Sequence, residues 1–217
     1  MKFYFFIICN LIYLLISAQD FDPTNPDYEL LKNIVIEKIN AKRHKKSKVE
    51  LLSNTSLQLT SDFYIQMLRA NKFENSSVNK LRLNKKIKKK CKMNGYKNAF
   101  LDFHITNIAC VNYKGKDFYF DKEDTETKPH LFEGKKPTKK ERSDESLKIT
   151  PLKLYTYNEL AEVIAKVFIN DEGAFKLLNN GFDKFGLSLS VEKNTLFRHK
   201  IPKIKIMLIL GGNRITW

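Results

Sequence analysis

The sequence predicts an α+β fold organised as a single domain. Two hydrophobic patterns occur along its 217 residues. Apolar residues recur every three or four positions over 26–94 and 156–178, which indicates amphipathic helices. They alternate with other residues over 99–113, 187–191 and 204–210, which indicates strands. A chain of this length can bury one good core.

Three amphipathic helices are expected in the first half of the chain. The first follows Asn25-Pro26, an N-cap with proline at the first helical position, and extends to about residue 44. The second begins near Ser56, and the third carries a lysine-rich run and ends at Gly95, a natural left-handed C-terminal cap. Their apolar stripes comprise Leu30, Leu31, Ile34, Val35 and Ile39 in the first helix, Leu57, Thr60, Phe63, Tyr64, Met67 and Leu68 in the second, and Leu81, Leu83, Ile87 and Cys91 in the third.

A long strand is expected over 99–113, followed by a charged insertion. One face of this strand is apolar except for Asn107, so that face should be buried. A turn at Lys114-Gly115 and the run 117–120 would complete a hairpin with it. Residues 121–148 have almost no apolar content and alternate in charge, which predicts a flexible segment. The face expected to be buried comprises Leu101, Phe103, Ile105, Asn107, Ala109, Val111 and Tyr113.

A second helical and strand pattern fills the C-terminal part. Thr156 and Glu159 form a capping box that starts a strongly amphipathic helix. Asp171 would cap a short helix over 173–178 that ends at Gly181. Alternating residues then predict a strand at 187–191 and another at 204–210. Because both sets of alternate residues are apolar in the last strand, we expect it to be central and covered on both faces.

The N-terminus reads as a secretory signal. Lys2 is followed by an apolar run that ends at Ala18, and polar Asn10 interrupts that run. An uncleaved anchor is the alternative interpretation, and it is disfavoured because the run is shorter than the roughly 20 residues that span a bilayer. The sequence therefore predicts a secreted or periplasmic protein that is not an integral membrane protein. Its mature domain would occupy 19–217.

Two cysteines remain in that mature domain. An oxidising compartment favours a disulfide between Cys91 and Cys110, and two free structural thiols are the alternative.

Positive charge is concentrated in the third helix. The whole chain carries a formal net charge of +15, and the segment KLRLNKKIKKKCK, residues 80–92, contributes eight basic side chains. Such a run can bind anionic lipid, glycan or an envelope polymer, and a solvated helix face is the alternative. No aromatic residue lies between these lysines, which disfavours nucleic acid as the ligand. The candidate ligand-binding residues are Lys85, Lys86, Lys88 and Lys89.

Several short motifs resemble the CAP superfamily, which includes the cysteine-rich secretory proteins, antigen 5 and plant pathogenesis-related proteins. Family members carry a segment like W-x-x-S-P-G-H-R-x-x-L-L-N-P-x-F followed by G-x-G. Phe168, Asn170, the run 177–182 and Phe185-Gly186-Leu187 occupy that frame, and Asn107-Ile108-Ala109 is similar to the end of a G-E-N-I-A motif. The order of helices and strands also resembles the bacterial secreted branch. This resemblance implies a three-layer α-β-α sandwich with a central, mostly antiparallel sheet.

The same resemblance implies a cleft with two histidines and two acidic residues. The positions that should hold them carry Thr106 instead of Glu, Gly173 instead of His, and Glu74 or Asn75 instead of the other His. Acid–base or metal chemistry needs the missing side chains. We therefore expect a non-enzymatic protein with no cofactor and no metal. It would bind a small apolar or amphiphilic ligand in the cleft, or a polyanion through the lysine helix.

A divergent hydrolase is the alternative function. Its site would be rebuilt around His104 with Asp102 or Glu74, and these side chains would then converge within hydrogen-bonding reach in a concave pocket. A third interpretation is an adhesion or virulence accessory whose segment 121–148 engages a partner.

Overall fold

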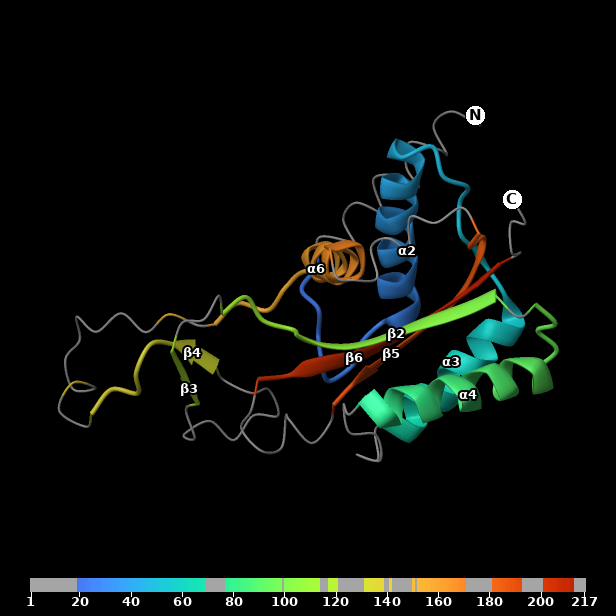
Figure 1. Cartoon of the computed structure of the whole chain (residues 1–217). Coiled ribbons are helices and arrows are strands. Elements are labelled where there is room, and N and C mark those ends of the chain that lie inside the picture. Colours follow the sequence, from blue (N-terminus) through green and yellow to red (C-terminus); the bar gives the residue numbers. More distant parts are fainter. Residues whose placement is uncertain are drawn as a thin grey trace.

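The computed structural model describes residues 19–68, 77–98, 100–113, 117–120, 131–138, 141, 150, 152–170, 181–192 and 201–212. Its larger sheet has four strands in the order β1-β5-β6-β2 (Figure 1). Strand β6 pairs antiparallel with β5 and with β2, and the short β1 is parallel to β5. The fold is therefore α+β with a mostly antiparallel sheet, as the sequence predicts. The strands are β1 (Leu52–Ser53), β2 (Phe100–Ala109), β5 (Lys184–Val191) and β6 (Lys203–Gly212).

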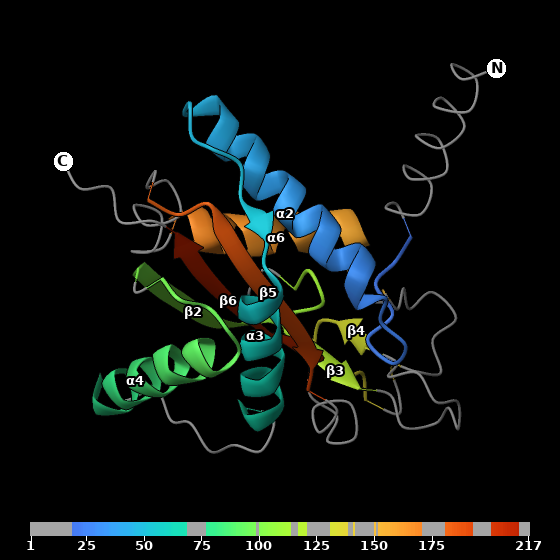
Figure 2. The ribbon, with the colours of Figure 1, turned by 90° about the vertical axis from the view of Figure 1, so that its right-hand side faces the viewer.

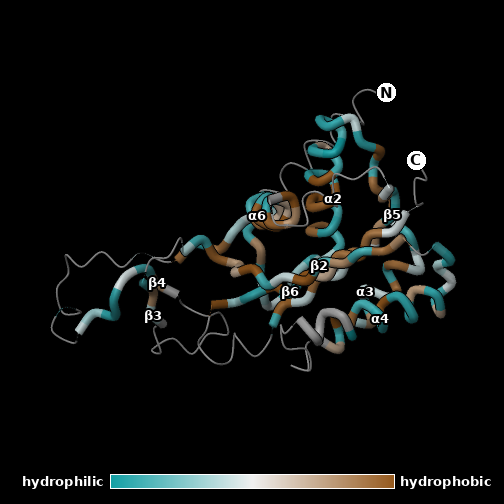
Figure 3. The backbone as a smooth tube through the Cα atoms, viewed as in Figure 1, coloured by the Kyte–Doolittle hydropathy of each residue, from teal (hydrophilic) through white to brown (hydrophobic). Residues whose placement is uncertain are grey.

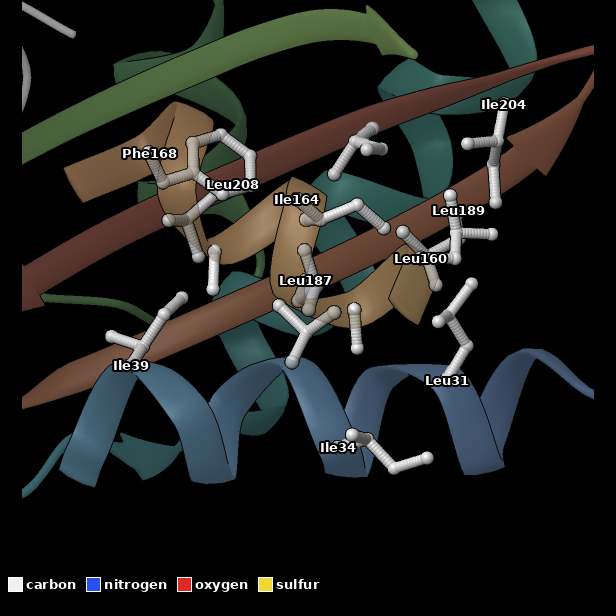
Figure 4. Packing of buried hydrophobic residues seen from close by; sticks show 14 of the residues in the cluster. Leu31, Ile34, Ile39, Leu160, Ile164, Phe168, Leu187, Leu189, Ile204 and Leu208 are labelled. Atoms are coloured by element: carbon white, nitrogen blue, oxygen red, sulfur yellow. The ribbon is translucent and has the colours of Figure 1, made fainter. Parts of the chain in front are cut away.

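Helices α2 (Tyr28–Lys45) and α6 (Tyr157–Asn170) cover one face of this sheet (Figure 2). They bury the larger of the hydrophobic clusters against the strands. In Figure 4, Ile164 of α6 lies beside Leu187 of β5, and Leu31 of α2 lies beside Leu160 of α6. Helix α2 packs in this way because its apolar residues recur every three or four positions and so lie together on the side of the helix that faces the sheet.

Helices α3 (Thr55–Leu68) and α4 (Ser77–Met93) cover the opposite face of the sheet (Figure 1). Their cluster combines Leu57 of α3 and Ile87 of α4 with Met207 and Ile209 of β6. The intervening residues of β6 belong to the cluster beneath α2 and α6. The prediction that this strand is central and covered on both faces is confirmed.

Side chains at the helix starts account for where α2 and α6 begin. At α6 the capping box is confirmed, because Glu159 N donates to Thr156 Oγ1 at 3.1 Å and Thr156 N donates to Glu159 Oε2 at 2.9 Å. At α2 the N-cap is Asp27, whose carboxylate accepts from Leu30 N at 2.9 Å. The helix therefore begins after the predicted Asn25-Pro26 start.

One buried arginine connects α2 to the sheet. Arg43 is fully buried, its Nε donates to Val49 O at 2.8 Å, and a terminal nitrogen donates to Phe182 O at 2.7 Å. Burial lowers the pKa of this guanidinium, and Asp183 opposes that shift. The arginine therefore fixes the segment after α2 to the residues that lead into β5.

The predicted burial of one face of the long strand holds at Val111, which is buried, but is wrong in the middle of the strand. Strand β2 is at the edge of the four-stranded sheet, and Ile105 and Asn107 on the face expected to be buried are exposed. Ile108 and Cys110, on the other face, are buried under the α2 and α6 layer. An edge strand is covered only where a helix reaches it, so alternation alone does not identify the covered face.

The predicted hairpin is also wrong. Strand β3 (Phe118–Phe120) pairs with β4 (Leu131–Glu133) rather than with β2, and the rings of Tyr119 and Phe132 stack with centroids 5.4 Å apart. Strand β4 comes from the segment 121–148 that was expected to be flexible. This part of the prediction is corrected, since the aromatic pair gives the segment local apolar contact.

Other predictions fall outside the described residues. They concern the signal at 1–18, the short helix at 173–178, and the candidate positions Gly173 and Glu74 with its neighbour Asn75. Within the described ranges, no helix combines the length and apolar character needed to cross a membrane.

Candidate functional site

Helix α4 presents a basic surface to solvent. Leu83, Ile87 and Cys91 are buried at intervals of four residues, so they form the inner side of the helix. The basic residues between them lie on the outer side. We call this set the basic face, and all of its members are exposed: Arg82, Lys85, Lys86, Lys88, Lys89 and Lys92.

The charge of the basic face is not neutralised by the rest of the described structure. Helix α4 contains no acidic residue. The ion pairs found among the described residues involve other lysines, such as Lys38 and Lys205. The four lysines predicted from the sequence are therefore placed together, exposed and available to an anionic ligand.

Exposed apolar side chains lie beside the basic face. Leu59 and Phe63, one turn apart on α3, are 53% and 43% exposed, and Met93 at the end of α4 is 69% exposed. The Nζ of Lys90 lies 4.4 Å from the centroid of the Phe63 ring, a cation–π contact that joins the two helices. We call Leu59, Phe63 and Met93 the apolar edge.

The sequence did not identify the apolar edge. Phe63 was expected in the buried stripe of its helix, and this prediction is wrong. The sequence feature that could have indicated its exposure is the width of that stripe. Leu57, Thr60 and Tyr64 already fill the inner side of α3, so Phe63 falls at its margin. A stripe wider than the surface beneath it leaves apolar residues in solvent.

Polar contacts hold α3 in place on β5. Gln58 Nε2 donates to Leu187 O and Leu187 N donates to Gln58 Oε1, both at 3.0 Å. The buried hydroxyls of Ser61 and Ser188 lie 2.7 Å apart, and Ser188 also donates to Asp62. These buried polar groups satisfy one another. They therefore serve to position α3, and with it the apolar edge.

Strand β2 brings two of the three residues of the alternative site together. His104 Nε2 lies 3.3 Å from Asp102 Oδ2, and both side chains are mostly buried. The imidazole lies edge-on to Phe168 of α6, with ring centroids 6.2 Å apart. The pair is therefore on the α2 and α6 face of the sheet, opposite the basic face.

An imidazole beside a carboxylate supplies two parts of a catalytic triad. Because Nε2 faces the carboxylate, the third part, a nucleophile, would have to meet Nδ1, and no hydrogen bond joins His104 to a hydroxyl or thiol among the described side chains. Thr106 follows on the same face of the strand and is half-buried, and no hydrogen bond links it to His104 among the described side chains. Nor does any group of three or more His, Cys, Asp or Glu in the described ranges form a possible metal site.

The two cysteines are separate. Cys91 and Cys110 are free, buried thiols that belong to the clusters on opposite faces of the sheet, so the disulfide considered from the sequence is not formed. Burial raises the pKa of Cys91, and it raises the pKa of Cys110 to about 12. Thiols of this kind are inert packing residues rather than nucleophiles.

Comparison with known proteins found no significant match. No family model matches the sequence, and neither a curated protein nor a solved structure shows significant similarity to the chain.

Proposed function

We propose that this protein is a secreted or periplasmic CAP-like module that binds a polyanionic ligand through the basic face of α4 and has no enzymatic activity. Helix pairs on both faces of the sheet support the three-layer α-β-α arrangement that the resemblance implies. The observation that carries the binding proposal is the exposure of Lys85, Lys86, Lys88 and Lys89 on a helix without an acidic residue.

Electrostatics gives the expected strength of this interaction. A lysine near an anionic surface contributes about 1 kcal/mol, so four lysines contribute about 4 kcal/mol, or roughly a thousandfold in affinity. Exposed charges are screened within about 8 Å at physiological ionic strength, so binding should weaken steeply as salt is added.

The test is retention on immobilised heparin, a soluble sulfated glycan, over a salt gradient. We expect the full chain to be retained at low salt, and a variant with Lys85, Lys86, Lys88 and Lys89 all changed to Glu to elute in the flow-through. The basic face is mid-helix and exposed, so this variant should fold, which circular dichroism would check.

A charge-matched control separates the basic face from net charge. Lys42, Lys45, Lys46 and Lys48 form a second basic cluster at and just beyond the end of α2. Changing all four to Glu alters the net charge by the same amount and should leave most of the retention in place. Equal loss in both variants would refute a dedicated binding face.

The second candidate function is a hydrolase that uses His104 and Asp102, and the 3.3 Å separation of their side chains favours it. It predicts that wild type cleaves at least one of a set of chromogenic esters, phosphoesters or glycosides, and that His104→Asn abolishes the activity. If wild type cleaves none of these substrate classes, or if His104→Asn retains the activity, this candidate is rejected.

A further inference from the structure

We propose that the anionic ligand of the basic face is the surface of a lipid bilayer, into which the apolar edge inserts. This inference rests on the proposed function and specifies its partner. It adds an observation that charge alone does not explain, namely three large apolar side chains exposed next to the lysines.

The apolar edge and the basic face form one surface. Leu59 and Phe63 are four residues apart on α3, and Lys86, Lys89 and Met93 recur at three and four residues on α4, so each set lies along one side of its helix. Two contacts bring these sides together.

One contact joins α3 to the last turn of α4, and the other joins it to the residue that follows α4. The ammonium group of Lys90 lies over the Phe63 ring, and Asn94 Nδ2 donates to Thr60 Oγ1 at 2.9 Å. Thr60 and Asn94 are the immediate neighbours of Leu59 and Met93 in the sequence. Phe63 therefore lies beside the end of α4 that carries Met93, and Leu59 lies one turn away from Phe63 on α3.

The position of the helix pair suits a flat partner. Helices α3 and α4 form the outer layer on their side of the sheet, and both run along it (Figure 1). Figure 3 shows apolar and polar segments side by side on these two helices. A planar surface could touch both helices at once.

The combination of charge and apolar surface favours a bilayer over a soluble polyanion. A sulfated or phosphorylated polymer pairs with lysines but offers nothing to a phenyl ring. At a membrane surface, Phe, Leu and Met enter the boundary of the acyl chains while lysine ammonium groups remain among anionic headgroups. Lys90 and Phe63 already place a cation next to an apolar ring on this surface, since the Lys90 Nζ lies over the ring of Phe63.

Charge also argues for a bilayer over a protein surface of mixed charge. The only carboxylate on α3 belongs to Asp62, which accepts hydrogen bonds from Gln58 and Ser188. Helix α4 has none. The surface thus offers no negative group to complement a mixed protein interface, and it matches a uniformly anionic plane.

The test compares vesicles with heparin. Full-length protein is sedimented with vesicles of phosphatidylcholine alone, or of phosphatidylcholine mixed with phosphatidylserine. We expect binding to the mixed vesicles only. The variant Leu59→Ser, Phe63→Ser, Met93→Ser should lose about tenfold or more in vesicle affinity, because each side chain no longer gains from leaving water. Its retention on heparin should be unchanged, and circular dichroism checks that it is folded.

A matched control and a second readout sharpen the result. Val49 and Phe118 are 61% and 36% exposed on segments away from α3 and α4, so Val49→Ser, Phe118→Ser should bind vesicles like wild type. In a Trp217→Phe background, Phe63→Trp should shift its emission to the blue on binding and be quenched by brominated lipid. Absence of quenching in bound protein would place the ring outside the bilayer and overturn the inference.

The two proposals fail in different ways. If wild type binds heparin but neither vesicle, or if the apolar variant binds mixed vesicles as well as wild type, the bilayer inference is wrong and polyanion binding stands. If the four-lysine variant keeps both heparin and vesicle binding, the proposed function itself is wrong.

Discussion

Gly186 offers the sharpest test of how the α3–α4 layer is positioned. This glycine lies on β5 directly beneath the first turns of α3. A methyl group added there would lie 2.5 Å from Gln58 N, and closer still to the carbonyl carbon and oxygen of Leu57. All three are backbone atoms, so no side-chain rotation can relieve the overlap. We therefore expect Gly186→Ala to push α3 away from the sheet.

The magnitude follows from that overlap. Adding a methyl group to a packed core costs about 1–3 kcal/mol, and a contact against backbone belongs at the upper end of that range. The displacement also lengthens the two 3.0 Å hydrogen bonds between Gln58 and Leu187. For a chain of this size, a loss of about 3 kcal/mol lowers the melting temperature by about 6–12 °C.

Thermal unfolding followed by far-UV circular dichroism is the assay, with Gly134→Ala as the control. Gly134 has a positive φ of 93°, and an added methyl group there meets nothing within 4 Å. Only backbone strain of about 1–2 kcal/mol opposes that change. We expect Gly186→Ala to melt well below Gly134→Ala. A Gly186→Ala protein as stable as the control would refute the close approach of α3 to β5.

Three further predictions concern stability. Arg43→Met leaves the carbonyls of Val49 and Phe182 without their donor, and it should lower the free energy of unfolding in urea by about 3 kcal/mol. Thr156→Ala removes half of the capping box and should lower it by about 1 kcal/mol. Burial raises the pKa of Cys110 from 9.0 to about 12, so unfolded chains lose this proton first. The contribution of this thiol to stability should therefore be fully present below pH 9 and should be lost as the pH rises towards 12. In the native protein the thiol should also resist alkylation by iodoacetamide at pH 8. A reactive native Cys110 would contradict its burial.

The sequence was sufficient to predict two kinds of element: those fixed by contacts between residues close in the sequence, and those covered on both faces. The capping box at Thr156 sets the start of α6 through two short-range hydrogen bonds, so its sequence pattern was sufficient. Strand β6 is covered on both faces, and a strand in that position shows continuous apolar residues whatever its neighbours are.

Prediction failed where a long-range partner decides the outcome. At the edge of the sheet, the burial of Ile105 or Ile108 depends on how far the helices of each layer extend over β2. The pairing of β3 with β4 likewise depends on contact across the charged segment between them, where Tyr119 meets Phe132. Neither relationship leaves a periodic signal in the sequence.

One part of the candidate site could be predicted from the sequence and the other could not. Exposure of Lys85, Lys86, Lys88 and Lys89 follows from the helical period once Leu83, Ile87 and Cys91 are turned inward, so the sequence was enough to predict it. The apolar edge was not predictable, because exposure of Phe63 depends on the orientation of α3. That orientation is set by the close approach at Gly186 and by the bonds from Gln58 to β5.

The two candidate functions occupy opposite faces of the same sheet, which makes them separable by experiment. Leu208, the β6 partner of His104, points towards α6, whereas Met207 and Ile209 beside it point towards α3 and α4. Side-chain changes on one face that leave the chain folded should therefore leave the other face unaltered, since distant sites without shared partners are additive. His104→Asn should leave heparin and vesicle binding intact, and the four-lysine variant should leave any hydrolysis intact. A variant that impaired both activities would show that the faces communicate through β6, and neither function could then be assigned to its face alone.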